Sequence, residues 1–106
     1  MRVVLDACVP ATLAPLIVGH DVRTVHQLHW SDLDDRPLLT AIDADCEVFV
    51  TTDRGLRHQQ RLGEHAFATV LLRARSNRLK DLEPLVPPLL TALDTLEPGE
   101  FLELAV

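Results

Sequence analysis

VFVTTDRG, residues 48–55, runs from three apolar residues through two threonines to a lone aspartate, Asp53, and then to an arginine and a glycine. The same order occurs earlier in VVLDAC, residues 3–8, where a short apolar run ends on Asp6. Short apolar runs of this kind are typical of buried strands. Two such runs that both end on a carboxylate predict a sheet whose strand ends carry polar groups.

Apolar runs alternate with amphipathic segments along the whole chain. The first helix is expected to begin at Pro10 and to place Leu13, Leu16 and Ile17 on one face. Further helices are predicted over residues 38–45, 54–62 and 82–96. Because prolines interrupt the last of these, a one-turn segment followed by a shorter helix from Pro87 is the alternative. Strands are predicted over residues 3–5, 21–25, 48–51, 67–72 and 101–104.

This alternation of strands and helices predicts an α/β fold. A mainly parallel sheet, covered on both faces, would form a single domain over residues 1–106. The composition agrees, because 47% of the 106 residues are hydrophobic and 25% are charged, as in an ordinary globular domain.

The sequence gives no sign of export or of a membrane segment. No apolar run approaches the roughly 20 residues that a membrane-spanning helix needs. The chain begins directly with MRVVLDA, without the apolar segment of a signal peptide. We therefore expect a cytoplasmic protein with no membrane partner. The sequence also lacks the GxSxG, GxGxxG and P-loop motifs, so nucleophilic hydrolase, dinucleotide-binding and NTPase functions have no support.

Two cysteines, Cys8 and Cys46, are expected to stay reduced. They form no CxxC pair and have no spacing typical of a zinc site. If the two apolar runs pair in parallel, Cys8 follows one strand while Cys46 precedes the other. Their separation would then be about 10 Å or more, which exceeds the reach of a disulfide.

Charge is unevenly distributed along the chain. The formal net charge is −6, yet residues 54–80 contain seven of the ten Lys and Arg and a single acid, Glu64. That segment carries +6, and the remainder, with three bases and fifteen acids, carries −12. The overall charge argues against a protein that coats nucleic acid non-specifically, but it conceals a basic middle segment.

Asp6 and Asp53 both follow predicted strands. Ligand sites of open parallel sheets form at the carboxyl ends of strands. If the two strands are neighbours, the carboxylates converge, and a cation or a shared proton is needed to relieve their repulsion. Mg²⁺ and Mn²⁺ suit such oxygen ligands and activate water for attack on a phosphate. The alternative is that each aspartate, or Thr52, caps the helix that follows.

A basic segment follows Asp53. On a helix, Arg54, Arg57, His58 and Arg61 would share one face beside the acids. This face is suited to the phosphates that flank a metal site, and a solvated charged face is the alternative. Gln59 and Gln60 add two amide groups to the same segment.

Four blocks of sequence, in order along the chain, carry a family resemblance. They are VVLDACVP (3–10), GHDVRTVHQLHW (19–30), VFVTTDRGLRHQQRL (48–62) and RSNRLKDLEPLVPPLLTALDTLEPGEF (75–101). In combination they resemble the small PIN-like proteins of the PilT N-terminus nuclease superfamily. The resemblance implies a three-layer α/β/α sandwich and metal-dependent cleavage of RNA. Many such proteins are toxins of bacterial or archaeal toxin–antitoxin pairs, so the implied partners are RNA, a small antitoxin protein and a second copy of the chain.

The resemblance also implies roles for particular residues. Asp6, Asp35 and Asp53 match the acids that bind Mg²⁺ or Mn²⁺ and carry catalysis, with Asp34 as an alternative to Asp35. Arg54, Arg57 and Arg61 are then placed to contact RNA phosphates. Gln59 and Gln60 resemble the signature of a subgroup with a TDxxLxxQQ-like block, where they belong to the site or anchor a short helix.

Two positions depart from the fuller PIN-like pattern. Ala7 stands where a glutamate often follows the first acid, and Gly55 stands where another acid often follows Asp53. Fewer carboxylates weaken Mg²⁺ binding, because this ion is held by carboxylates and water. Two hypotheses therefore stay open: a metal-dependent ribonuclease, and a PIN-like module without activity that binds a protein partner.

Overall fold

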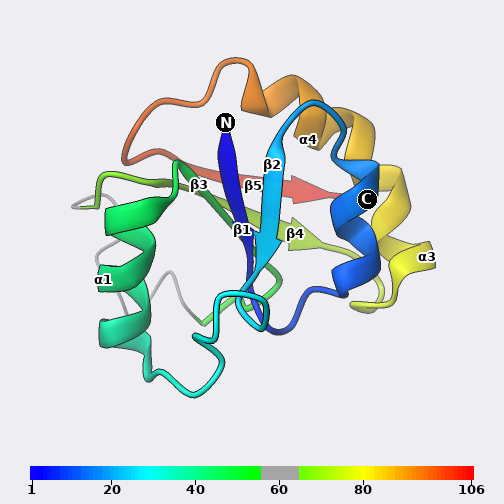
Figure 1. Ribbon diagram of the computed structural model, residues 1–106. Helices are drawn as coiled ribbons and strands as arrows, with labels where there is room; N and C mark the ends of the chain where they lie inside the picture. The colour runs from blue at the N-terminus through cyan, green and yellow to red at the C-terminus, as the bar shows by residue number, and fades with distance from the viewer. Residues whose placement is uncertain (56–64) are drawn as a thin grey trace.

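The centre of the molecule is a wholly parallel sheet (Figure 1). The computed structural model describes residues 1–55 and 65–106, with Asp35 described by its backbone alone. Within these residues the sheet has five strands in the order β2-β1-β3-β4-β5. The strands are β1 (Arg2–Leu5), β2 (Asp21–Thr24), β3 (Val48–Thr51), β4 (Ala68–Arg73) and β5 (Phe101–Ala105).

Helices cover both faces of the sheet, which confirms the predicted α/β fold with a mainly parallel sheet in three layers. Helix α1 (Asp35–Asp45) lies on one face. The other face is covered by the 3₁₀ helix η1 (Ala11–Leu16), the short helix α3 (Leu79–Leu82), the 3₁₀ turn η3 (Glu83–Leu85) and helix α4 (Val86–Leu93).

Two hydrophobic cores follow from the alternation of side chains along the strands. Val3 and Leu5 point to the face covered by η1, α3 and α4, where they join a core that includes Leu13 and Leu89. Val4 points to the opposite face. There it packs in a second core, together with Val25, Leu39, Ile42, Cys46, Phe49 and Phe67.

The strand order determines where a ligand site can form. β1 pairs with β2 on one side and with β3 on the other, so the chain leaves β2, crosses β1 and returns beside it as β3. The connections on the two sides of β1 therefore diverge at the carboxyl ends of β1 and β3. In open parallel sheets this point is where ligands bind.

The C-terminal helical region is divided, as the alternative expectation had it. The prediction of a continuous helix over residues 82–96 is wrong, because α3, η3 and α4 follow one another as separate segments. Pro84 lies in η3, while Pro87 and Pro88 lie in the first turn of α4, where a proline loses no helical hydrogen bond. Helix α4 then presents Val86, Leu89 and Leu93 to the core.

Two other helix predictions need correction. The segment after Pro10 is a 3₁₀ helix, in which Leu13 is buried but Leu16 is 36% exposed, so Leu16 does not share the buried face with Leu13 and Ile17. Of the helix predicted over residues 54–62, Arg54 and Gly55 lie in a turn and the remainder lies outside the described residues. In the described part of the chain, no helix is long and apolar enough to cross a membrane.

The position of η1 can be tested with the same substitution at two leucines. Leu13→Ala removes a side chain with 0% exposure and should lower the free energy of unfolding by about 2–5 kcal/mol, because it leaves a cavity. Leu16→Ala, at a 36% exposed position, should cost about 1 kcal/mol or less. Urea denaturation measures both. Equal losses would contradict the 3₁₀ geometry and support a regular amphipathic helix.

Candidate functional site

Asp6 is held at the end of β1 by the sheet itself. Its backbone N–H donates to the carbonyl oxygen of Val50 at 2.9 Å, which continues the β1–β3 ladder by one residue. Its carbonyl oxygen accepts a hydrogen bond from the N–H of Val9 at 3.0 Å, which turns the chain toward η1. The backbone of Asp6 is therefore fixed on both sides, and its half-buried side chain stands at the carboxyl edge of the sheet.

The hydroxyl of Thr51 joins the ends of β1 and β3. Thr51 is the last residue of β3, is 1% exposed, and donates from Oγ1 to Asp6 Oδ2 at 2.7 Å. The same oxygen accepts from the backbone N–H of Asp53 at 3.0 Å. One buried hydroxyl thus orients the carboxylate of Asp6 and the backbone of Asp53.

The Asp6 carboxylate has further partners. Its Oδ1 accepts from the N–H of Ala7 at 2.8 Å, and its Oδ2 receives the Sγ–H of Cys8 at 3.5 Å. Cys8 Sγ also lies 3.7 Å from Thr51 Oγ1. A carboxylate bound on both oxygens has a single orientation, which is what a ligand or a catalytic group requires.

Asp53 is exposed and less constrained. Its Oδ1 accepts from the N–H of Gly55 at 2.9 Å, the hydrogen bond of an Asx turn. Among the described residues its Oδ2 has no hydrogen-bond partner. The side chain of Asp53 therefore shapes the turn after β3 with one oxygen and offers the other to the solvent or to a ligand.

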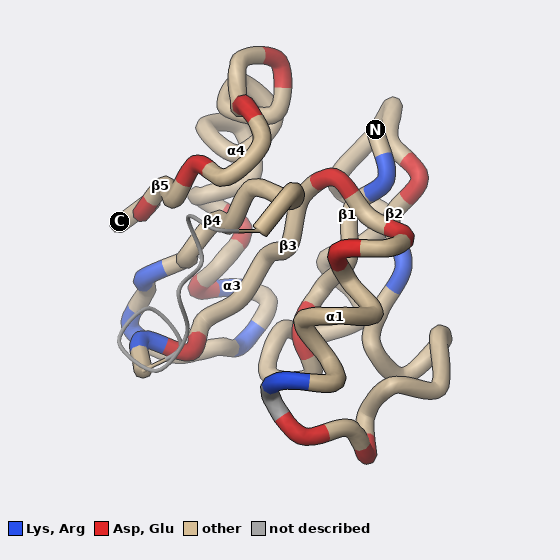
Figure 2. Tube along the Cα trace, turned by 90° about the vertical axis from the view of Figure 1, so that its left-hand side faces the viewer, with Lys and Arg blue, Asp and Glu red and all other residues tan. Residues whose placement is uncertain are grey.

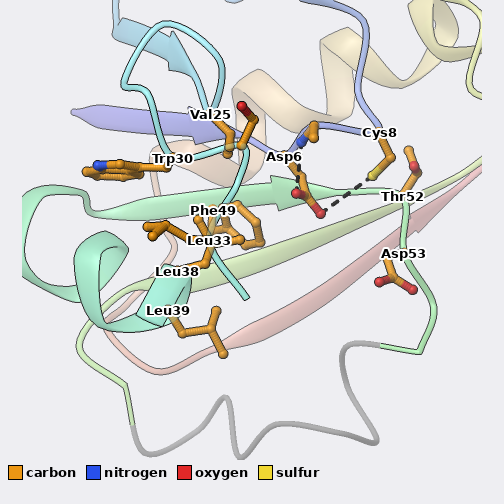
Figure 3. A pocket seen from close by; sticks show the side chains of 12 residues that line it. Asp6, Cys8, Val25, Trp30, Leu33, Leu38, Leu39, Phe49, Thr52 and Asp53 are labelled. Carbon is orange, nitrogen blue, oxygen red and sulfur yellow. Dashed lines mark hydrogen bonds between the residues drawn. The ribbon is translucent and has the colours of Figure 1, made fainter. Parts of the chain in front are cut away.

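Asp6 and Asp53 line the same cavity, which has a volume of about 480 Å³ (Figure 3). The two acids lie beyond the ends of β1 and β3, together with Cys8 and Thr52, and the ring of Trp30 lies at the other end of the cavity. Most of the other described lining residues are apolar by type, namely Ala7, Val25, Leu33, Leu38, Leu39 and Phe49, and Ser31 is polar. The cavity thus joins an acidic end to an apolar one.

The other predicted acids belong to the start of α1. Asp34 is the N-cap residue, is exposed, and is not among the described residues that line the cavity. Asp35 is the first residue of α1. This helix begins beside the cavity, because Leu33 and Leu38 both line it.

The basic residues predicted beside the acids are described only in part. Arg54 is exposed in the turn after Asp53. Five of the predicted residues lie outside the described part of the chain: Arg57, His58, Gln59, Gln60 and Arg61. Figure 2 shows that the remaining Lys and Arg of the basic middle segment gather around the carboxyl ends of β3 and β4 and along α3.

The donors at the acidic end fit a hydrated divalent cation. Asp6 already accepts three hydrogen bonds, of the roughly four that a carboxylate can accept, so it keeps one position for a ligand. Asp53 accepts one hydrogen bond among the described residues, so its other acceptor positions are available to a ligand. Mg²⁺ is usually held by one or two carboxylates and several waters, which two such aspartates can supply. In the described part of the chain, no three His, Cys, Asp or Glu side chains form a metal-binding group.

The sequence interpretation missed Thr51, Cys8 and Asn77. Asn77 Nδ2 donates to the carbonyl oxygen of Cys8 at 3.0 Å, so it ties the loop after β4 to the loop after β1. A signal for Asn77 was present, because the polar stretch ARSNR follows the apolar run of β4 just as Asp6 and Asp53 follow β1 and β3. No comparable signal identifies Thr51 or Cys8.

The two cysteines are free and differ in environment. Cys46 is 6% exposed, and burial raises the pKa of its thiol from 9.0 to about 12. The folded protein therefore keeps this thiol protonated where the unfolded chain loses the proton. Burial of the protonated Cys46 thiol therefore adds its full share to the free energy of unfolding below pH 9. This share declines as the pH rises from 9 toward 12. Cys8 is half-buried at the cavity.

Comparisons with protein-family models, with curated proteins and with solved structures gave no match. The inference of function therefore rests on the geometry of the cavity and on the sequence.

Two threonine-to-valine substitutions test the role of the Thr51 hydroxyl. Thr51→Val removes a hydrogen bond to Asp6 and leaves the N–H of Asp53 without its acceptor, so it should lower the free energy of unfolding by about 1–3 kcal/mol. Thr69→Val on β4 is the matched control. Thr69 is 0% exposed, and its hydroxyl has no partner among the described residues, so valine should leave stability unchanged or raise it. An equal loss of unfolding free energy in both variants would contradict the structural role given to the Thr51 hydroxyl.

Thiol reactivity tests the difference between the cysteines. At pH 8, Ellman's reagent should modify Cys8 quickly and Cys46 slowly, because the thiolate is the reactive form and the pKa of Cys46 is raised to about 12. The Cys8→Ser protein should be nearly unreactive until it is denatured. Fast modification of folded Cys8→Ser protein would show that Cys46 is not in the core.

Proposed function

We propose that this protein is a PIN-like ribonuclease that depends on Mg²⁺ or Mn²⁺ and acts in the cytoplasm as the toxin of a prokaryotic toxin–antitoxin pair. One observation carries the proposal: Asp6 and Asp53 line a single cavity at the point where the connections of the sheet diverge. The described Lys and Arg residues around the ends of β3 and β4 support it, because positively charged residues suit a polyanionic substrate. The toxin–antitoxin setting rests on the sequence resemblance.

The chain's own residues have distinct parts in this proposal. Asp6, oriented by Thr51 and Ala7, and Asp53 would hold the metal ion at the acidic end of the cavity. Asp35 completes the set of acids suggested by the resemblance. When bound, Mg²⁺ or Mn²⁺ lowers the pKa of a water molecule and offsets the negative charge of a phosphate. Arg54 holds substrate phosphates beside Asp53, and Arg57 and Arg61 have the same proposed role.

Cleavage assays with carboxylate-to-amide variants test the activity. Purified protein should cleave single-stranded RNA with Mg²⁺ or Mn²⁺, and Asp6→Asn and Asp53→Asn should each lower the rate at least about 100-fold, because each removes a charged ligand. The control is Asp21→Asn, an exposed acid of β2 whose ion pair with Arg23 lies away from the cavity. Absence of cleavage by the unmodified protein with either metal, or equal loss in the control, would refute the proposal.

A second candidate function is a PIN-like module without activity that binds a protein partner such as an antitoxin. The hydrogen bonds of Asp6 favour it, because Thr51, Ala7 and Cys8 give this carboxylate a structural role that needs no metal. The two functions differ in a growth assay. If expression of the protein arrests growth, a ribonuclease loses that effect with Asp6→Asn, whereas a binding module retains it.

A further inference from the structure

A second cavity, with a volume of about 240 Å³, adjoins the one that holds the acids. Thr52 lines both, so the two cavities meet at the residue that follows β3. Two arginines line the second cavity, and no acid is among its described lining residues. These residues are Thr52, Arg54, Leu72, Arg73, Ala74, Ser76 and Asn77.

The loop that forms one wall of this basic cavity is held by its own hydrogen bonds. Ser76 Oγ donates to the carboxylate of Asp81 and accepts from the N–H of Arg78 at 3.1 Å. Asn77 Nδ2 donates to the carbonyl oxygen of Cys8 at 3.0 Å, which leaves its second amide hydrogen available. Because the hydroxyl of Ser76 is used within the loop, the two arginines and Asn77 supply the donors for a ligand.

The two arginines retain donors for an anion. Arg73 pairs through Nη1 with Glu103 at 3.1 Å, which occupies one of the five N–H groups of its guanidinium. Arg54 is exposed and has no ion pair among the described residues. Arg75, Arg78 and Lys80 follow β4 along the chain, are exposed, and add positive charge between the end of β4 and the first turn of α3.

We propose that this basic cavity is a phosphate subsite for single-stranded nucleic acid, and that it binds the phosphate next to the one that would lie at the metal ion of Asp6 and Asp53. The inference rests on the proposed function, and it adds a binding site outside the cavity lined by Asp6 and Asp53, here called the acidic cavity. Arg54 and Arg73 bind the phosphate oxygens, since guanidinium groups match them bidentately.

An oligonucleotide suits these features better than an acidic peptide. Its phosphates repeat along one chain, so neighbouring phosphates can reach both cavities across Thr52. Its bases can stack on an aromatic ring, and Trp30 stands half-buried in the wall of the acidic cavity. An unpaired strand is required for such stacking, because the bases of a duplex are already stacked on one another.

Binding of a fluorescein-labelled oligouridylate in EDTA, followed by anisotropy, tests the subsite without any cleavage. The Arg54→Gln/Arg73→Gln protein should bind at least about 10-fold more weakly at low salt, and the slope of log K against log[salt] should be shallower by about 0.7 for each phosphate that the variant no longer binds. The matched control is Arg2→Gln/Arg23→Gln. It removes the same charge from two exposed arginines that are already paired with Asp45 and Asp21.

Three results would overturn the inference: equal weakening in both double variants, unchanged binding in Arg54→Gln/Arg73→Gln, or a larger effect of these changes on polyglutamate than on the oligonucleotide. Arg54→Gln alone, at an exposed position, gives a separate test if the double variant unfolds, and it should show a smaller loss of the same kind. The binding and cleavage results are independent. Binding that needs these arginines, in a protein without cleavage activity, would support the subsite and reject the ribonuclease. Cleavage by the unmodified protein, together with unchanged binding in Arg54→Gln/Arg73→Gln, would support the ribonuclease and reject the subsite.

Discussion

The parallel pairing of β1 with β3 is the interaction on which the candidate site depends. Val3, Val4 and Leu5 pair with Val48, Phe49 and Val50, and the N–H of Asp6 extends this ladder to the carbonyl oxygen of Val50. Because the register is fixed by two buried faces, a slip of one residue would exchange the two hydrophobic cores. The same register brings Asp6 beside the end of β3, where Thr51 and Asp53 follow.

The hydroxyl of Thr51 turns this backbone pairing into a site. It is buried, bonded to the carboxylate of Asp6 and to the N–H of Asp53, and it therefore couples the orientation of one acid to the turn that carries the other. A buried hydroxyl with satisfied hydrogen bonds contributes to stability and also restricts conformation. Structure and proposed function thus depend on the same group, so a loss of activity at Thr51 alone would not separate them.

Charge separates the two cavities at this edge. The acidic end of the larger cavity suits a cation, and the basic cavity beyond Thr52 suits an anion. The net charge of −6 does not reveal this arrangement, because the described bases of residues 54–80 gather at the ends of β3 and β4 and along α3, while fifteen of the sixteen acids lie outside this segment of the sequence. Under the proposed function, these bases offset the unfavourable total charge at the place where the polyanion binds.

Local pattern was sufficient for the strands and for the acids that follow them. β3 was predicted with the observed bounds, and the α/β fold followed from the alternation of apolar runs with amphipathic segments. The roles of Thr51, Cys8 and Asn77 were not predictable, because each depends on a hydrogen bond to a residue that is brought near by strand register and loop geometry. The exposure of Leu16 was missed because apolar spacing does not distinguish a 3₁₀ helix from an α-helix.

We propose that Asp6 and Asp53 form one cation site at the junction of β1 and β3. Adding substoichiometric Mn²⁺ to ¹⁵N-labelled protein tests it most directly, because the paramagnetic ion broadens the amide signals nearest to it. We expect selective broadening of the amide signals of Ala7, Thr52 and Asp53, which is lost in Asp6→Asn and retained in Asp21→Asn. Broadening spread evenly over exposed acids elsewhere, such as Asp45 and Asp94, or unchanged in Asp6→Asn, would contradict it.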